Sequence, residues 1–67
     1  MSETPFVVNA YRDNVRAMKI ITSVLDGPPT FTSDSQAKWV KRGGRNDEYR
    51  AKLEEAGLVD GETMFIE

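Results

Sequence analysis

The sequence predicts an α+β fold in which three helices pack with a small antiparallel sheet or hairpin. Three observations predict it: an apolar repeat at helical spacing near the N-terminus, short β-prone runs near both ends, and glycine-containing turns between the elements. A chain of 67 residues fits one domain with a thin core, because chains of this size bury only about 60% of their unfolded surface. We expect residues 1–67 to form that domain, with residues 1–5 loosely held.

The composition is typical of a folded, water-soluble chain, with 39% hydrophobic and 30% charged residues. There is no cysteine, which excludes disulfides and thiolate metal sites. The longest apolar runs are only a few residues, too short to span a bilayer, and residues 1–5 do not resemble a signal peptide. We therefore expect a cytoplasmic protein with no cofactor and no membrane partner.

The N-terminal third predicts a short strand and then a helix. Phe6–Val8 is β-prone and could add a strand to a sheet edge. Asn9 is the predicted N-cap of a helix over residues 10–25. Apolar residues recur in it at helical spacing at Tyr11, Val15, Met18, Ile21 and Leu25. Ala17, Ile20 and Val24 widen this face, so we expect the helix to be covered on more than one side.

The middle of the chain predicts a helix stop, a short extended segment and a second helix. Asp26–Pro29 ends the first helix, because glycine accepts the left-handed C′ conformation and proline cannot continue the hydrogen bonds. Thr30–Thr32 is β-branched and aromatic, as in a short strand. Ser33–Gln36 fits a capping box, which predicts a helix from Asp34 to Arg42 that stops at Gly43–Gly44.

A third helix is predicted from Asn46, its N-cap, to Gly57. Asp47 and Glu48 fall in its first turn, where the helix dipole favours negative charge. Its apolar positions are Tyr49, Leu53 and Ala56. Leu58 follows Gly57 at the place of the hydrophobic contact that accompanies a Schellman cap.

The last residues predict a hairpin. Asp60–Gly61 suits a type I′ turn between Val59 and a returning strand over Thr63–Ile66. We expect the apolar end of that strand to pair with Phe6–Val8 and close a small sheet. The alternative is an edge left free to pair with another chain, giving a homodimer or a strand-addition contact.

This order of elements resembles the winged helix-turn-helix family over about residues 10–66. The closest phrase is Lys52-Leu53-Glu54-Glu55-Ala56-Gly57-Leu58-Val59, since in that family such a phrase ends the recognition helix and begins the first wing strand. The resemblance implies a small DNA-binding transcription regulator. The chain departs from the pattern where acids at Asp47 and Glu48 replace exposed bases, so DNA contact is not assigned to this helix.

The charge pattern places the candidate binding site elsewhere. Residues 36–45 hold four of the nine basic residues and no acid, whereas residues 46–67 hold two bases and seven acids. The bases can contact phosphates, and the tryptophan can stack on a base. The candidate site residues are Lys38, Trp39, Lys41, Arg42 and Arg45, joined by a predicted helical stripe of Arg12, Arg16 and Lys19. The alternative is a solvated helix face neutralised by the downstream acids.

Trp39 has two interpretations, a core ring or an interface anchor, and we favour the core. Catalysis is not expected, because the chain has no histidine or cysteine and its adjacent acids diverge on a helix. The leading hypothesis is a small regulatory protein that contacts nucleic acid. The alternative is a protein-binding modulator or adaptor, such as a phage-type or accessory inhibitor of a larger host machine like the transcription apparatus. A third possibility is a virion or structural accessory component.

Overall fold

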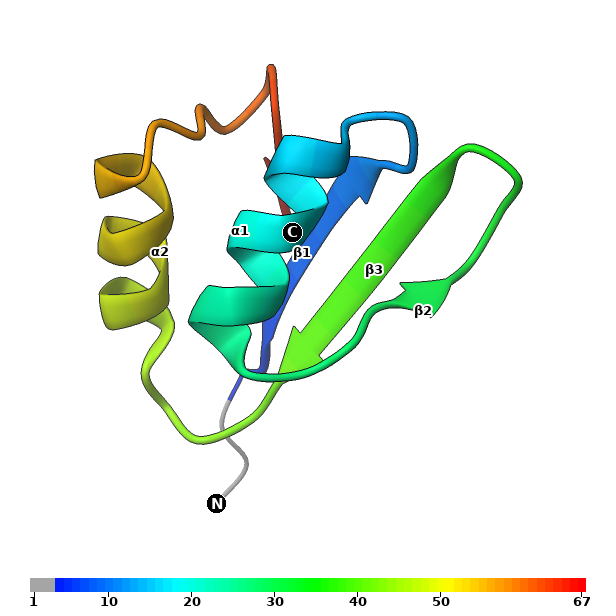
Figure 1. Ribbon diagram of the computed structural model, residues 1–67. Helices are drawn as coiled ribbons and strands as arrows, with labels where there is room; N and C mark the ends of the chain where they lie inside the picture. The colour runs from blue at the N-terminus through cyan, green and yellow to red at the C-terminus, as the bar shows by residue number, and fades with distance from the viewer. Residues whose placement is uncertain (1–3) are drawn as a thin grey trace.

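The computed structural model describes residues 4–67, in which two helices lie on one side of a four-stranded antiparallel sheet (Figure 1). The strands lie in the order β2-β3-β1-β4 across the sheet. This arrangement is the split β-α-β topology. The elements are β1 (Phe6–Tyr11), α1 (Val15–Leu25), β2 (Thr30–Phe31), β3 (Gln36–Lys41), α2 (Asn46–Glu55) and β4 (Phe65–Ile66).

The strand β1 lies inside the sheet and pairs with a neighbour on both sides. Val8 lies opposite Trp39 of β3 and opposite Ile66 of β4. Side chains alternate along the strand, so Phe6, Val8 and Ala10 are buried under the helices and the residues between them are not. The pairing of the C-terminal strand with Phe6–Val8 is thus confirmed, and β1 extends beyond the predicted run to Tyr11.

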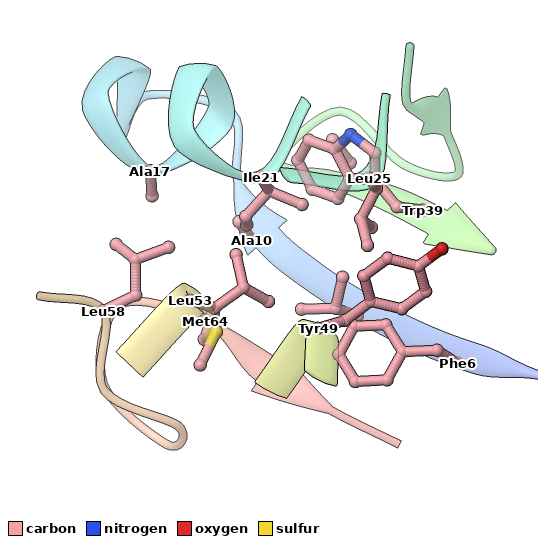
Figure 2. Close-up of a cluster of buried hydrophobic side chains, with 12 residues drawn as sticks. Phe6, Ala10, Ala17, Ile21, Leu25, Trp39, Tyr49, Leu53, Leu58 and Met64 are labelled. Atoms are coloured by element: carbon pink, nitrogen blue, oxygen red, sulfur yellow. The ribbon is translucent and has the colours of Figure 1, made fainter. Parts of the chain in front are cut away.

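The core lies between the helices and the covered face of the sheet (Figure 2). The helix α1 contributes Ala17, Ile21 and Leu25, which recur every four residues on one face. The helix α2 contributes Tyr49 and Leu53, and the Tyr49 ring lies 5.6 Å from that of Phe6. The remaining members of this single cluster are Val8, Ala10, Ala37, Trp39, Leu58 and Met64.

The fold contains two helices, so the predicted three-helix, winged-helix-like arrangement is wrong. The predicted helix over Asp34–Arg42 is the strand β3. Ala37 and Trp39 are buried while Gln36 and Lys38 are only half-buried, which is the period of a strand. The capping-box serine still receives local hydrogen bonds, because Ser33 Oγ accepts from the backbone N–H of Ser35 and of Gln36, but the chain then continues extended.

The start of the first helix was also predicted wrongly. Its N-cap is Asn14, whose side chain accepts a hydrogen bond from the N–H of Ala17 at 3.2 Å, and the helix begins at Val15. Asn9 lies in the middle of β1. The helix ends where predicted, at Leu25, but Asp26 takes the left-handed conformation (φ 52°) that we assigned to Gly27.

The last helix ends as the sequence predicts. Leu58 N–H donates to the carbonyl of Leu53, and Gly57 N–H donates to that of Glu54, which together form a Schellman motif. Gly57 has a φ of 99°, and Leu58 is buried. The predicted N-cap is wrong, because Arg45 holds that position and Asn46 instead donates its side-chain amide to the Thr4 carbonyl.

Residues Val59–Met64 form turns and not the predicted hairpin. The Val59 carbonyl accepts from the N–H groups of Glu62, Thr63 and Met64, which curls the chain around Asp60–Gly61. The strand that follows, β4, pairs with β1. The short strand at Thr30–Phe31 is confirmed as β2. Of the predicted loose segment, residues 1–3 lie outside the described residues, while Pro5 is half-buried.

Leu53→Ala should bring the domain close to unfolding. The side chain is fully buried, and such truncations cost about 2–5 kcal/mol, whereas a domain of this length has a free energy of unfolding of about 3–10 kcal/mol. Urea unfolding followed by Trp39 fluorescence measures the loss. Glu54→Ala, at the exposed neighbouring position, is the control and should change stability by less than about 0.5 kcal/mol. Equal effects of both changes would contradict this packing.

Candidate functional site

The predicted basic site is divided, because the side chains of β3 alternate between the two faces of the sheet. Lys38 projects onto the uncovered face of the sheet, while Trp39 projects into the core and is 3% exposed. The indole Nε1 donates to Thr22 Oγ1 of α1 at 3.3 Å, so Trp39 ties the sheet to the helix. Lys41 lies opposite the buried Phe6 and so projects to the helix side of the sheet. The five residues therefore do not share one surface, and Trp39 belongs to the core.

Lys38 is neutralised on the uncovered face. Its Nζ lies 3.5 Å from Glu67 Oε2, and the same oxygen accepts a hydrogen bond from the Asn9 side chain at 2.8 Å. The hydrogen bond from Asn9 and the charge of Lys38 lower the pKa of the Glu67 carboxyl below its usual range. A lysine held next to an ionised carboxylate is a poor phosphate contact.

The remaining three bases of the segment border the turn between β3 and α2. We call Lys41, Arg42 and Arg45 the basic turn. Gly43 and Gly44 between them have φ values of 138° and 73°, which other residues rarely adopt. Within residues 4–67 the ion pairs are Lys38–Glu67 and Lys52–Glu48, so none of the three bases of the basic turn is paired there.

The predicted stripe of Arg12, Arg16 and Lys19 is also divided. Arg12 precedes α1 and reaches the loop before β3, where its Nη1 donates to the Ser33 and Asp34 carbonyls at 3.4 and 3.5 Å. Its guanidinium lies 4.5 Å from the centre of the Phe31 ring. Arg16 lies beside Gly57, on the side of α1 that faces the end of α2. Arg12 and Lys19 instead border a groove on the other flank of α1.

That groove is a shallow hollow with a volume of about 560 Å³, and we call it the α1 groove. Its lining is mostly apolar, and Val15 in it is 57% exposed although the sequence predicted it for the core. The lining residues are Arg12, Val15, Met18, Lys19, Thr22 and Ser23. The sequence did carry a signal for this surface, since α1 is apolar on more than one side. From this pattern we predicted a helix that is covered on more than one side.

The uncovered face of the sheet is a second candidate surface. Tyr11 of β1 and Phe65 of β4 form an edge-to-face pair with ring centres 5.3 Å apart. Val40 is 50% exposed, and Val7 lies directly opposite it. The hydrogen-bonded row of Asn9, Lys38 and Glu67 interrupts this apolar surface. The face is therefore mixed, with its principal charges already paired to each other.

The described residues can also be compared with the features of metal sites and of membrane-spanning helices. Within residues 4–67 the acidic side chains do not gather in groups of three that would suit a metal ion. Neither of the two helices there is long and apolar enough to cross a bilayer. Comparisons of the chain with protein-family models, curated proteins and solved structures find no match.

Asn9→Ala and Lys38→Met should each raise the pKa of the Glu67 carboxyl, because the hydrogen bond from Asn9 and the charge and hydrogen bond of Lys38 all lower it. The stabilisation from this contact is present above the ordinary glutamate pKa of about 4.3 and is lost as the pH falls through the lowered value. An NMR titration of the side-chain carboxyl carbon measures the change. Thr30→Ala, next to Lys38 in the sheet, is the control. An unchanged pKa in both variants would contradict the network.

Proposed function

We propose that this chain is a non-catalytic protein-binding module, a modulator or adaptor that docks a larger protein through the α1 groove. The observation that carries this proposal is the exposure of Val15 at 57% on a flank of α1 that is only partly covered, where the neighbouring Met18 is half-buried against the core. Single exposed apolar residues are ordinary, but a hollow lined mainly by apolar atoms and bordered by charge is typical of a docking surface.

The distribution of charge supports a protein partner over nucleic acid. The chain has a net charge of -2, whereas nucleic-acid-binding domains are usually basic overall or carry a continuous basic patch. Lys38 is paired with Glu67, and Lys52 is paired with Glu48. The bases that remain are separated among the two flanks of α1, the basic turn and Arg50 of α2.

Contact with nucleic acid through the basic turn is a second candidate function. Its support is specific: Lys41, Arg42 and Arg45 surround a glycine turn and have no ion-pair partner within residues 4–67. Three such cations can contact phosphates without any sequence preference. Asp47 and Glu48 follow directly in the first turn of α2 and oppose this binding.

A photoreactive p-benzoylphenylalanine in place of Val15 should cross-link to a protein in extracts of the native source. The same residue in place of Val59, which is 49% exposed on the turn after α2, is the matched control. We expect an adduct from position 15 that nuclease treatment leaves intact and that mass spectrometry identifies. Binding of the purified partner should then fall about tenfold with Val15→Glu. Equal labelling from both positions, or labelling of nucleic acid alone, would contradict the proposal.

Two triple variants with equal charge test the nucleic-acid candidate. If the basic turn contacts phosphates, replacing Lys41, Arg42 and Arg45 by alanine should make binding to random duplex DNA less sensitive to salt. The slope of log affinity against log salt concentration should fall by the equivalent of about three phosphate contacts. Replacing Arg12, Arg16 and Lys19 by alanine removes the same charge and should leave that slope unchanged. Fluorescence anisotropy over a range of salt concentrations measures both slopes. Similar losses in the two variants would reject a site at the basic turn.

A further inference from the structure

The lining of the α1 groove is shallow and has the periodicity of a helix-docking surface. Its lining from Val15 onward comes from α1, at Val15, Met18, Lys19, Thr22 and Ser23. These positions repeat at three and four residues and so form one ridge of the helix. They extend over about 12 Å at 1.5 Å per residue, or a little more than two turns. A linear partner that lies along this ridge can make continuous contact with it.

The groove lies near the short edge strand of the sheet, because Arg12 in its lining lies over the Phe31 ring of β2. The strand β2 has only two residues, Thr30 and Phe31, and Phe31 remains 55% exposed. Thr22 Oγ1 of this lining accepts the hydrogen bond from Trp39, which satisfies the indole N–H. An apolar side chain placed over Val15 and Met18 would therefore not leave that buried donor unpaired.

Among residues 4–67 the charged side chains that line the groove are Arg12 and Lys19, both basic. Neither has an ion-pair partner in that part of the chain. Arg12 is held in place by the Phe31 ring and the Ser33 carbonyl, and a guanidinium retains further N–H groups for a carboxylate. The neighbouring acids Asp13 and Asp34 line a separate hollow on the other side of Arg12.

From this geometry, and resting on the proposed function, we propose that the α1 groove binds an amphipathic helix of another protein with acidic residues beside its apolar stripe. The apolar stripe of that helix covers Val15 and Met18, and its carboxylates meet Arg12 and Lys19. Helix-in-groove recognition of this kind uses anchors at i, i+3 or i+4 and i+7. The charge pairs set the orientation of the helix and select an acidic partner over a basic one.

A second copy of the chain does not supply such a helix. Its acidic helix is α2, with Asp47 and Glu48 in the first turn. The large apolar residues of α2, Tyr49 and Leu53, are buried in its own core. A neighbouring copy would thus offer negative charge without an apolar stripe. The complementary partner is a different protein.

Selection of displayed 20-residue helical peptides against the full chain tests the inference. We expect the selected peptides to be acidic and amphipathic and to shift the NMR signals of Val15 and Met18. Lys19→Glu should lower the affinity for these peptides about tenfold and raise the affinity for versions in which lysine replaces the acids. Val15→Glu should abolish binding, whereas Val59→Glu, at an exposed position away from the groove, should not. The far-UV circular dichroism of all three variants should remain unchanged, because the replaced side chains are exposed.

Three results would overturn the inference in distinguishable ways. Basic or neutral peptides bound in the groove would refute the acidic partner while leaving a protein-binding module. Selected peptides that shift the NMR signals of Val40 and Phe65 instead, or a selection that yields no binding peptide, would refute helix docking in the groove. The cross-linking experiment at position 15 would then test, separately, whether the groove binds a protein at all. A concentration-dependent dimer abolished by Val15→Glu would assign the groove to self-association.

Discussion

The structure depends on the position of β1 inside the sheet. Only this strand pairs along its length with β3 and also with β4, and its buried residues Phe6, Val8 and Ala10 form the floor of the core. Side chains of a strand alternate between its faces, so burying these three necessarily turns Val7, Asn9 and Tyr11 to the other side. Two helices suffice to cover one face of such a sheet. In a chain of 67 residues nothing in the described part remains to cover the other.

The small number of elements also leaves one flank of α1 partly exposed. Its buried residues Ala17, Ile21 and Leu25 face the sheet and α2, while Val15 and Met18 lie towards the side where β2 is only two residues long. Met18 is partly buried against the core, whereas Val15 is 57% exposed, so the apolar surface of α1 exceeds at Val15 what its own core uses. This excess, with the basic side chains of Arg12 and Lys19 at its border, is the physical basis for a docked partner.

Local signals in the sequence predicted where the helices end better than they predicted whether the middle segment is a helix or a strand. The Gly57–Leu58 cap was predictable because a Schellman motif depends on neighbouring residues alone. The segment from Gln36 to Lys41 was not, because Ser33 and Gln36 satisfy a helix-capping pattern while the partner that makes the segment a strand lies in β1. The pairing with β1, which is distant in the sequence, decides that this segment is a strand and not a helix. The same error placed Trp39 and the neighbouring lysines on one helix, whereas a strand sends them to opposite faces.

The candidate site was predictable only in part for the same reason. Arg12 and Lys19 were identified from their spacing, but their separation from Arg16 depends on which flank of α1 packs against the rest of the fold. Charge along the chain does not show that Glu67 neutralises Lys38, since the two residues meet only when β4 joins the sheet beside β1. The sequence therefore predicted an apolar, basic-edged helix but not which part of it remains uncovered.

The most direct test of this account is a comparison of methyl NMR spectra of the selectively labelled chain in buffer and in extract of its native source. The account predicts that the signals of Val15 and Met18 shift or broaden in the extract while those of Val7 and Val40, on the uncovered face of the sheet, remain unchanged. Shifts confined to Val7 and Val40 would contradict it and would assign the binding surface to the sheet.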